Sequence, residues 1–354
     1  MHTLVVGGTG FLGLHIVDEL SKRGHQVSVL CRSPEKAKEI IPDTINLLQG
    51  DLEQLNTEDW EKLLQPFDGL VFAAGVDERA KPKGDAFKFF HDANVAPLER
   101  LLMAARKTNI SHVVLLNSIF SFIDRKYPEL NLTQHHPYIA SRVEQSQMAH
   151  RVAKGHFIVT VLEVPWVFGR SHREIPMWST LVNYVRGAVP ILVTGGGANM
   201  ISVTSVAQAV YGGLTYPKSS TTLPIGDTNM TWKELLEKMC DCTRRKDKNI
   251  NIVSDSMFRQ LTKTGHMLQD LMGEQSGLDT AELPRLVLTE GFYDPTESQQ
   301  LLQYETGHLD AAIQQTVDAV PENQYLRNWR KYINLFVNPN TFKNPTKKNN
   351  KTDT

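Results

Sequence analysis

Short apolar runs rich in β-branched residues alternate with helical patterns over the first half of the chain. The strand-like runs are Thr3–Val6, Gln26–Leu30, Leu70–Ala73, Val113–Leu116 and Phe157–Leu162. The helical patterns begin near Gly10, cover 93–108, and begin again at Pro137. Strands that alternate with helices in this way pair in parallel. The rhythm therefore predicts an α/β protein with a doubly wound parallel sheet over residues 1–169.

The alternation fades after Gly169, where glycine, proline and aromatic residues become frequent. We expect a smaller, mixed lobe over 170–337, with a return of the chain to the first domain near 201–215. Inside this lobe, Thr231 followed by Glu234 is a capping-box pattern that predicts a helix through about residue 243, and 309–320 predicts another. Residues 338–354 are almost entirely Asn, Lys, Thr and Pro, so we expect a disordered tail.

Composition narrows the classes of function. The 354 residues carry 38 basic and 39 acidic side chains, so no overall charge attracts nucleic acid or an anionic membrane. Three cysteines are too few and too irregular for a disulfide framework, which favours a reducing, cytoplasmic location. No apolar run approaches the roughly 20 residues of a transmembrane helix, and no residue pattern predicts a metal site.

A glycine-rich loop provides the first candidate chemistry. The strand Thr3–Val6 runs into the loop of 7–13, whose sequence is Gly-Gly-Thr-Gly-Phe-Leu-Gly, and a helical pattern follows. Gly7 permits a tight turn, Gly10 lets the backbone approach a pyrophosphate, and Gly13 allows close packing of helix on strand. The helix N-terminus then offers amide donors to the anion. We assign the cofactor-binding residues Gly7, Thr9, Gly10, Phe11, Leu12 and Gly13 to this loop.

The end of the second strand indicates which nucleotide binds. An acidic residue there would bind the ribose diol and repel a 2′-phosphate, but this chain has Cys31, Arg32 and Ser33. Arg32 can give a bidentate fork to a phosphate, and Ser33 can add a donor. We therefore expect NADP in preference to NAD.

The Gly-x-x-Gly-x-x-Gly spacing resembles the extended short-chain dehydrogenase/reductase family of NAD(P)-dependent epimerases, dehydratases and reductases. Further landmarks of that family follow in order, closely to about residue 215: Gly50-Asp51-Leu52, Ala73-Ala74-Gly75, Asn94-Val95, Ser118, Tyr138 with Arg142, and Pro165-Trp166-Val167-Phe168-Gly169. The resemblance implies a Rossmann-type domain. It also places further residues at the cofactor: Asp51, Leu52, Ala73, Ala74, Gly75, Asn94, Pro165 and Val167.

The same resemblance implies that Ser118, Tyr138 and Arg142 are catalytic. Tyr138 would donate a proton to a carbonyl oxygen, and positive charge one helical turn later would ease that exchange. The family has lysine where this chain has Arg142. Arginine keeps the charge but cannot release a proton. Two alternatives follow: the charge suffices with water completing the relay, or the chain binds nucleotide without efficient turnover.

The substrate side of the predicted site is apolar. Its expected lining residues are Phe120, Phe122, Trp166, Phe168, Met177 and Trp178. Relatives that act on sugar nucleotides carry an arginine after the Gly-x-Gly turn of the outer lobe, and the stretch 195–201 here has none, although Arg170 and Arg173 could compensate. The resemblance is therefore nearest the branch of dihydroflavonol reductases and hydroxysteroid dehydrogenases.

These observations predict an NADP-dependent oxidoreductase that reduces a hydrophobic carbonyl or oxidises the matching alcohol. Two alternatives stay open: a catalytically weak nucleotide-sensing or assembly protein, and a sugar-nucleotide epimerase or dehydratase. We expect a small apolar substrate, no nucleic-acid partner, and a monomer or homodimer.

Overall fold

The computed structural model describes residues 1–170, 177–245, 247–271, 273 and 275–321. The predicted tail at 338–354 and Arg173 lie outside these residues. No helix in the described ranges combines the length and apolarity that crossing a bilayer requires.

A seven-stranded sheet forms the centre of the larger domain. Its order is β10-β6-β5-β4-β1-β2-β3, and each neighbouring pair is parallel. The strands are β1 (His2–Val6), β2 (Gln26–Cys31), β3 (Asn46–Gln49), β4 (Gly69–Phe72), β5 (His112–Ser118), β6 (Ile158–Val164) and β10 (Thr221–Pro224). This confirms the predicted doubly wound α/β fold.

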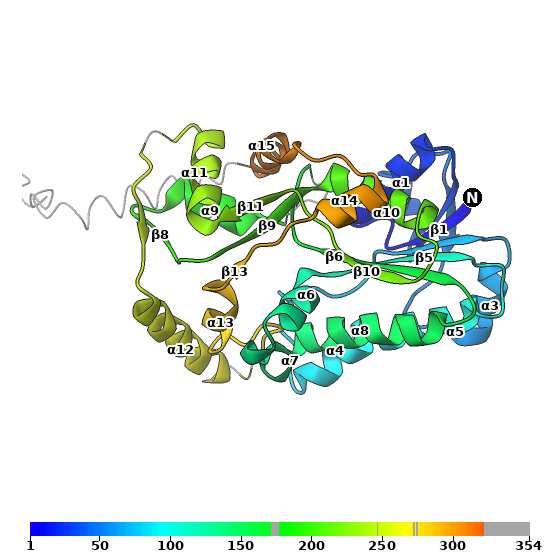
Figure 1. Ribbon diagram of the computed structural model, residues 1–354, viewed down its shortest axis with the longest axis horizontal. Coiled ribbons are helices and arrows are strands. Elements are labelled where there is room, and N and C mark those ends of the chain that lie inside the picture. Colours follow the sequence, from blue (N-terminus) through cyan, green and yellow to red (C-terminus); the bar gives the residue numbers. More distant parts are fainter. Residues whose placement is uncertain (171–176, 246, 272, 274, 322–354) are drawn as a thin grey trace, which may run out of the picture.

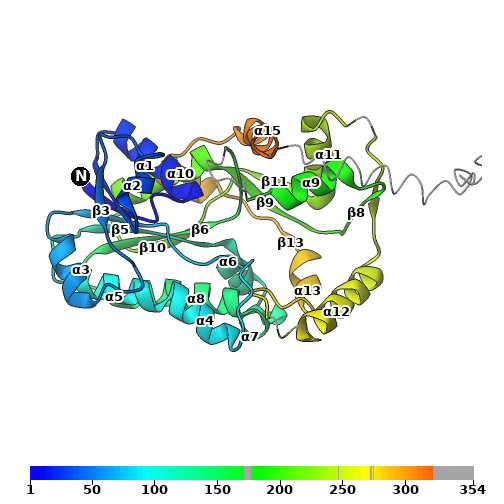
Figure 2. The ribbon, with the colours of Figure 1, turned by 180° about the vertical axis from the view of Figure 1, so that it is seen from behind.

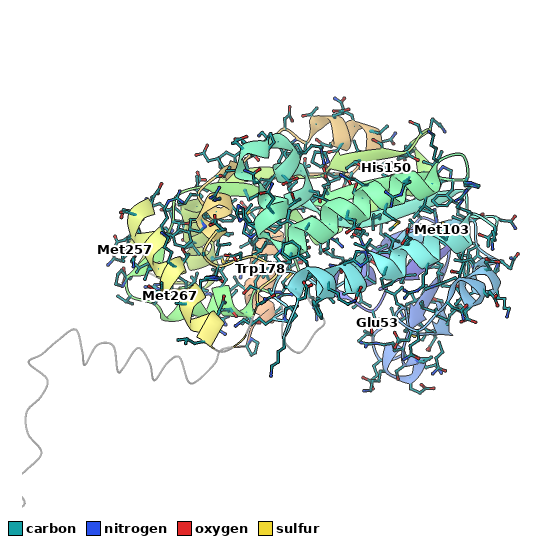
Figure 3. The ribbon with its side chains drawn as sticks, turned by 90° about the horizontal axis from the view of Figure 1, so that it is seen from below. Glu53, Met103, His150, Trp178, Met257 and Met267 are labelled. Atoms are coloured by element: carbon teal, nitrogen blue, oxygen red, sulfur yellow. The ribbon has the colours of Figure 1, made fainter. Side chains whose placement is uncertain are left out.

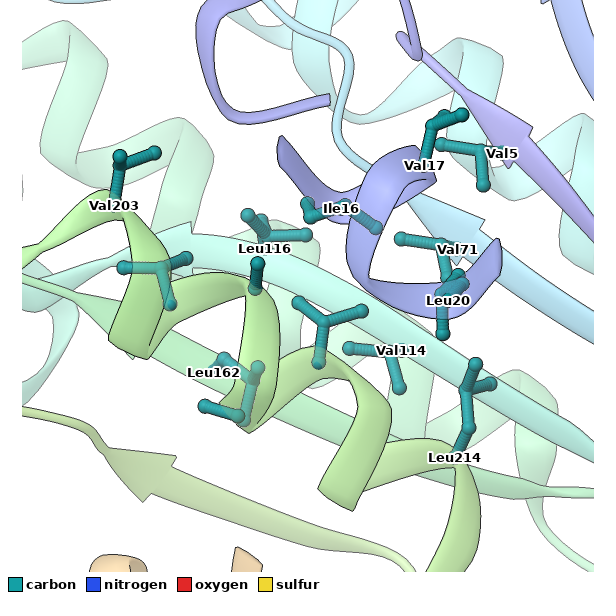
Figure 4. Close-up of a cluster of buried hydrophobic side chains, with 14 of the residues drawn as sticks. Val5, Ile16, Val17, Leu20, Val71, Val114, Leu116, Leu162, Val203 and Leu214 are labelled. Carbon is teal, nitrogen blue, oxygen red and sulfur yellow. The ribbon is translucent and has the colours of Figure 1, made fainter. Parts of the chain in front are cut away.

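Helices cover both faces of the sheet (Figures 1 and 2). On one face lie α1 (Phe11–Lys22), α10 (Val203–Thr215) and α14 (Thr296–Leu302), with the short α2 (Pro34–Ala37) beside the sheet edge. On the other lie α3 (Thr57–Leu64), α4 (Ala86–Asn94), α5 (Ala96–Ala105) and α8 (Pro137–Ala153). Figure 4 shows the first layer, in which Ile16 and Leu20 of α1 and Leu214 of α10 pack on strand residues such as Val71 and Val114. The chain thus returns to the sheet through α10 and β10.

The expected single helix over 93–108 is wrong, because the structure has two helices that meet at Val95. Pro97 lies in the first turn of α5. Proline has no backbone N–H and its ring clashes with the preceding turn, so a continuous helix would lose a hydrogen bond there. The break ends α4 at Asn94, which places that side chain beside the end of β4.

A smaller, mixed lobe lies at the carboxyl end of the sheet. Its strands are β7 (Trp166–Phe168), β8 (Ile191–Val193), β9 (Gly197–Ser202), β11 (Thr228–Thr231), β12 (Ile250–Ile252) and β13 (Glu290–Gly291). Its helices are α9 (Ser179–Gly187), α11 (Trp232–Cys242), α12 (Asp255–Leu271), α13 (Leu283–Val287) and α15 (Leu309–Ala319). The predicted capping box is present, with Thr231 and Glu234 bonding each other's backbone amides. A separate cluster that includes Phe168, Met200 and Ile313 forms the lobe's core.

Short helices connect β5 to α8 across the junction between the two parts. They are α6 (Ile119–Lys126), a 3-10 turn at Pro128–Leu130 and α7 (Leu132–His135). The junction therefore contains the end of β5 and the start of α8, where the sequence placed Ser118 and Tyr138.

Candidate active site

The glycine-rich loop joins β1 to α1 at the carboxyl edge of the sheet. Gly7 has φ +88°, a conformation that favours glycine, and its carbonyl accepts a hydrogen bond from the Gly10 amide at 3.0 Å. Gly10 is the N-cap of α1, and no side chain caps the first amides of that helix. Uncapped amides at a helix N-terminus are a ready anion site. Thr9 is partly exposed within the loop.

Gly13 lies where helix and strand come closest. A Cβ atom at this position would be 2.1 Å from the carbonyl oxygen of Gly7. No side chain fits that gap, so glycine alone allows α1 to pack at this distance. The geometry is the close approach of helix to strand that the sequence motif requires.

Arg32 and Ser33 follow β2 at the same edge of the sheet. The Arg32 side chain is exposed, and no hydrogen bond or ion pair engages its guanidinium within the described ranges. Ser33 is the N-cap residue of α2, and its hydroxyl makes no capping bond. Both side chains are therefore available to a ligand.

Asp51 and Leu52 follow β3 and shape the next turn. The Asp51 carboxylate accepts hydrogen bonds from the Glu53 amide at 3.1 Å and from the Gln54 side chain at 3.2 Å. Leu52 is partly buried and packs against the hydrophobic cluster that includes Leu30, Trp60 and Phe72. Asp51 thus stabilises its own turn.

The end of β4 forms the floor of a cavity. Ala73, Ala74 and Gly75 line it, and Gly75 has φ +147°. Asn94 is fully buried beside this turn: its Oδ1 accepts from the Val76 amide at 2.8 Å, and its Nδ2 donates to the Val76 carbonyl at 3.1 Å. Asn94 does not line the cavity. It holds the turn that does.

Ser118 and Tyr138 meet at the cavity wall. Ser118 ends β5 and is 7% exposed, and Tyr138, in the first turn of α8, is also 7% exposed. Burial raises the pKa of the Tyr138 phenol, while the charge of Arg142 and the neighbouring Ser118 side chain act in the opposite direction. The two side chains therefore line one cavity, with Ser118 close enough to act on the phenol.

Arg142 lies one turn after Tyr138 and is itself buried. Its guanidinium carbon is 5.8 Å from the centre of the Tyr138 ring, and its Nη2 donates to the Leu116 carbonyl at 2.7 Å. Its Nε is buried and has no hydrogen-bond partner among the described residues. A buried donor without a partner is costly unless a ligand or water satisfies it.

These side chains share a cavity of about 230 Å³ with the cofactor-loop residues Phe11 and Leu12. Four of the six expected apolar residues line it: Phe120, Trp166, Met177 and Trp178. The predicted cofactor contacts Pro165 and Val167, before and within β7, line it as well. Trp178 lies near the middle of the view in Figure 3, and its indole N–H donates to the Val167 carbonyl at 2.8 Å.

Two of the expected cavity residues lie elsewhere. Phe168 is fully buried in the core of the lobe, where it stacks on Trp178 at 5.2 Å. Phe122 packs against Tyr293 instead, with ring centres 5.0 Å apart. Trp166 and Val167 at the start of β7 line the cavity, whereas Phe168 at its end is enclosed by the lobe, and a run of apolar residues does not reveal this difference.

Three polar residues of the site were missed by the sequence reasoning. Asp77 and Glu78, just after the β4 turn, line the cavity. Asn117 donates to the Arg142 carbonyl at 2.9 Å and so ties β5 to α8 at the level of the site. The available signal was position, because side chains just beyond the carboxyl ends of parallel strands gather at one edge.

The site fits a dinucleotide on several independent observations. The α1 amides are uncapped, Gly7 and Gly13 leave no room for side chains, Arg32 is exposed, and the buried Nε of Arg142 lacks a partner. Gly7, Gly10 and Arg32 would hold the phosphates, with the remaining end of the nucleotide in the cavity.

The sequence profile of the NAD dependent epimerase/dehydratase family matches residues 3–222. The chain belongs to this family. The match confirms the predicted resemblance and places the chain in a family of NAD(P)-dependent enzymes.

Characterised relatives are distant and match only in part. A ketoreductase from Stigmatella aurantiaca that acts on 4-hydroxy-2-methyl-3-oxo-4-farnesyl-3,4-dihydroquinoline-1-oxide is 27% identical over 48% of this chain and 51% of its own length. The decarboxylating sterol-4-alpha-carboxylate 3-dehydrogenase of Homo sapiens is 23% identical over 59% of this chain and 55% of its own. The chain thus spans about half the length of these relatives.

Solved structures share the fold over most of the chain. The crystal structure of gox2253 has a TM-score of 0.74 at 17% identity and covers 93% of this chain and 99% of its own. UDP-N-acetylglucosamine 4-epimerase from Bacillus cereus has a TM-score of 0.64 at 18% identity, with coverage of 90% and 95%. At these identities the likeness establishes the fold alone.

Proposed function

We propose that the chain is an NADP-dependent oxidoreductase that reduces a hydrophobic carbonyl compound or oxidises the matching alcohol. The observation that carries this proposal is the placement of Ser118 and Tyr138 in the wall of one largely apolar cavity. The cavity adjoins the end of the glycine-rich loop at Phe11 and Leu12. The similarity to a ketoreductase and a sterol dehydrogenase supports the same reaction class.

The bound nicotinamide would supply or accept the hydride. In reduction, the Tyr138 phenol donates a proton to the carbonyl oxygen as that oxygen becomes an alkoxide. The Ser118 hydroxyl donates a second hydrogen bond to the same oxygen and orients it. The low exposure of both side chains keeps bulk water away from the reacting atoms.

Arg142 supplies charge rather than a proton. Its guanidinium is held at the Leu116 carbonyl, and it lowers the pKa of Tyr138 against the effect of burial. Because arginine does not deprotonate at physiological pH, Arg142 cannot return the proton to Tyr138, and a single water bound in the cavity would do so after each turnover. The unpartnered Nε would donate to a hydroxyl group of the nucleotide.

The preference for NADP rests on Arg32 and Ser33. Both follow β2, which ends in Cys31 rather than in an acidic residue, and the guanidinium is exposed with no partner in the described part of the chain. We also place the protein in the cytoplasm, because its three cysteines are unpaired and a reducing compartment keeps thiols so.

A sugar-nucleotide epimerase is the second candidate. A UDP-glucose 4-epimerase from Lactobacillus helveticus is 29% identical over 36% of this chain. Arg170 is exposed at the end of the segment after β7, where a second diphosphate would need a cation. A nucleotide-sensing protein is the third candidate, and Arg142 in place of lysine favours it.

The test is NADPH-dependent reduction of a panel of aryl ketones by wild type and Tyr138→Phe. The variant should lose at least 100-fold in rate, since a positioned general acid contributes about 10²–10⁴-fold, while its affinity for NADPH stays unchanged. Full activity in Tyr138→Phe contradicts the proposed proton donor. A wild type that binds NADPH but reduces nothing, and instead interconverts UDP-sugars, favours the second candidate.

A further inference from the structure

Glu78 places a carboxyl group in the wall of the cavity that the reaction proposed above does not use. It lies three residues after Gly75, in the segment that leaves β4, and lines the same cavity as Ser118 and Tyr138. Apart from its neighbour Asp77, the other lining side chains in the described ranges carry no carboxyl group. An acid in such a wall needs a partner.

The backbone around Glu78 is fixed from two sides. Asn94 bonds both the amide and the carbonyl of Val76, two residues earlier. On the other side, Gly277 from the outer lobe approaches so closely that a Cβ there would be 2.8 Å from the Glu78 carbonyl oxygen and 2.6 Å from the Phe90 ring. The same Gly277 carbonyl accepts the Tyr138 backbone amide at 3.0 Å. The loop around Gly277 therefore contacts the backbone of both Glu78 and Tyr138.

The two neighbouring acids differ in their partners. Asp77 forms an ion pair with Arg79, whose Nη1 also donates to the Met177 carbonyl at 3.3 Å across the cavity rim. No other side chain bonds the Glu78 carboxyl in the part of the chain that the structure describes. The Arg142 guanidinium lies beside Gly75, and its buried Nε also lacks a partner among the described residues. Both the Glu78 carboxyl and the Arg142 Nε can therefore serve a ligand.

The charges that face Glu78 do not neutralise it. Burial raises the pKa of the Glu78 carboxyl and the charge of Asp77 adds to this, while Arg79 and Arg142 act against it. The Glu78 charge in turn raises the pKa of the Tyr138 phenol. The Glu78 carboxyl and the Tyr138 phenol therefore interact electrostatically at one small cavity.

We propose that Glu78 determines substrate specificity by accepting a hydrogen bond from a hydroxyl or amino group on the carbon next to the reacting carbonyl. This proposal rests on the oxidoreductase function proposed above. The substrate class is an α-hydroxy or α-amino carbonyl compound whose remaining surface is apolar. The carbonyl oxygen meets Tyr138 and Ser118, the apolar part meets Trp166 and Trp178, and the neighbouring donor meets Glu78. Simple ketones bind more weakly in this arrangement, because they leave the partly buried Glu78 carboxyl without a ligand donor.

The test uses three probes of one shape: acetophenone, phenacyl alcohol and phenacylamine. Each is titrated by calorimetry into the complex of the protein with NADP⁺, in which no reduction can occur. Phenacyl alcohol or phenacylamine should bind at least about tenfold tighter than acetophenone, since a hydrogen bond to a charged group has that effect. Glu78→Leu should abolish the difference. Glu53→Leu, at the exposed position labelled in Figure 3, is the control and should preserve it.

Glu78→Gln separates the two donors and guards against a misfolded leucine variant. Glutamine keeps an acceptor but no charge, so it should retain a preference for phenacyl alcohol and lose one for the ammonium form of phenacylamine. Each variant is first checked for unchanged NADP⁺ affinity.

Equal wild-type affinities for the three probes, or no binding by any of them, overturns the role of Glu78. So does a preference that survives in Glu78→Leu. These results leave the proposed function standing if NADPH still reduces simple ketones. Conversely, a Glu78-dependent preference without any NADPH consumption supports the inference about Glu78 as a binding residue and contradicts the proposed reaction.

Discussion

Replacing Arg125 by leucine tests how the walls of the candidate active site are held together. Arg125 lies on α6, the helix that begins directly after Ser118, and Glu163 lies on β6, one residue before the cavity-lining Val164. Two hydrogen bonds of 2.8 and 2.7 Å join the guanidinium to the carboxylate. The pair therefore connects the helix after Ser118 to the strand that ends at the cavity-lining Val164.

The size of the effect follows from the burial of the carboxylate. The Glu163 side chain is 0% exposed, whereas that of Arg125 is 55% exposed. Removing one partner of a buried pair costs about 3–5 kcal/mol. Because the exposed guanidinium is partly screened by solvent, we expect the lower end, about 3 kcal/mol, which corresponds to roughly 4 °C in melting temperature for a chain of 354 residues.

The loss should depend on pH. Burial raises the pKa of the Glu163 carboxyl, and Arg125 holds it down. Without Arg125 the folded-state pKa rises further above the unfolded value, so the folded state prefers the protonated acid. Stability is then greatest below the unfolded pKa and falls as pH rises through the raised folded pKa. Arg125→Leu should consequently be near wild type in stability at pH 4 and fully destabilised at pH 7.

The assay is urea unfolding at both pH values, with Lys88→Leu as control. Lys88 pairs with Asp92 on the surface, where the two side chains are 70% and 52% exposed, so its loss should not change the unfolding midpoint. Adding Glu163→Leu to Arg125→Leu should recover most of the lost stability. A loss that is equal at pH 4 and pH 7, or that the second substitution deepens, would refute the reasoning.

Three further substitutions test the cofactor loop, the nucleotide preference and the cation beside Tyr138. Gly13→Ala should unfold at a lower temperature and bind nucleotide poorly, because its Cβ would be 2.1 Å from the Gly7 carbonyl oxygen. Gly195→Ala is the control, since no atom lies within 4 Å of the added Cβ, and it should match wild type in thermal melts and in nucleotide titrations. Arg32→Ala should remove most of a preference for NADPH over NADH that we expect to be at least tenfold, from a charge-assisted bond of about 1.5–3 kcal/mol; equal wild-type affinities in fluorescence titrations would contradict the NADP assignment. Arg142 lowers the pKa of Tyr138, so Arg142→Met should move the pH at which the rate of alcohol oxidation rises to a higher value, and Arg142→Lys should leave it in place. An unshifted pH–rate profile in Arg142→Met would show that the charge does not act on the phenol.

Much of the larger domain could be predicted from the sequence because its signals are local. Buried parallel strands are continuous apolar runs, and five of the seven were recognised as such. The strand β3 was missed because its four residues, 46–49, are only partly buried and too short to show a pattern. The helices α4 and α5 were merged because the apolar period continues through Val95, although Pro97 marks the break.

The site was predictable only where a motif has a fixed spacing. The glycine loop and the pair Ser118 and Tyr138 have such spacing, and the structure brings these two hydroxyl groups together. Glu78 and Glu163 have none, because each depends on a partner or cavity formed by distant segments: Gly277 reaches Glu78 from about 200 residues later, and Arg125 reaches Glu163 from another element. Phe168 and Phe122 show the converse error, since composition alone does not reveal which way a side chain points.

Transfer of a labelled hydride tests the central claim most directly. Purified protein is incubated with [4,4-²H₂]NADPH and a ketone that it binds, and the product is examined by mass spectrometry. The account predicts an alcohol with one deuterium on the carbinol carbon, formed by wild type and at least about 100-fold more slowly by Tyr138→Phe. Tight NADPH binding without any deuterated alcohol from the whole ketone panel, in wild type and in Arg142→Lys alike, would contradict it.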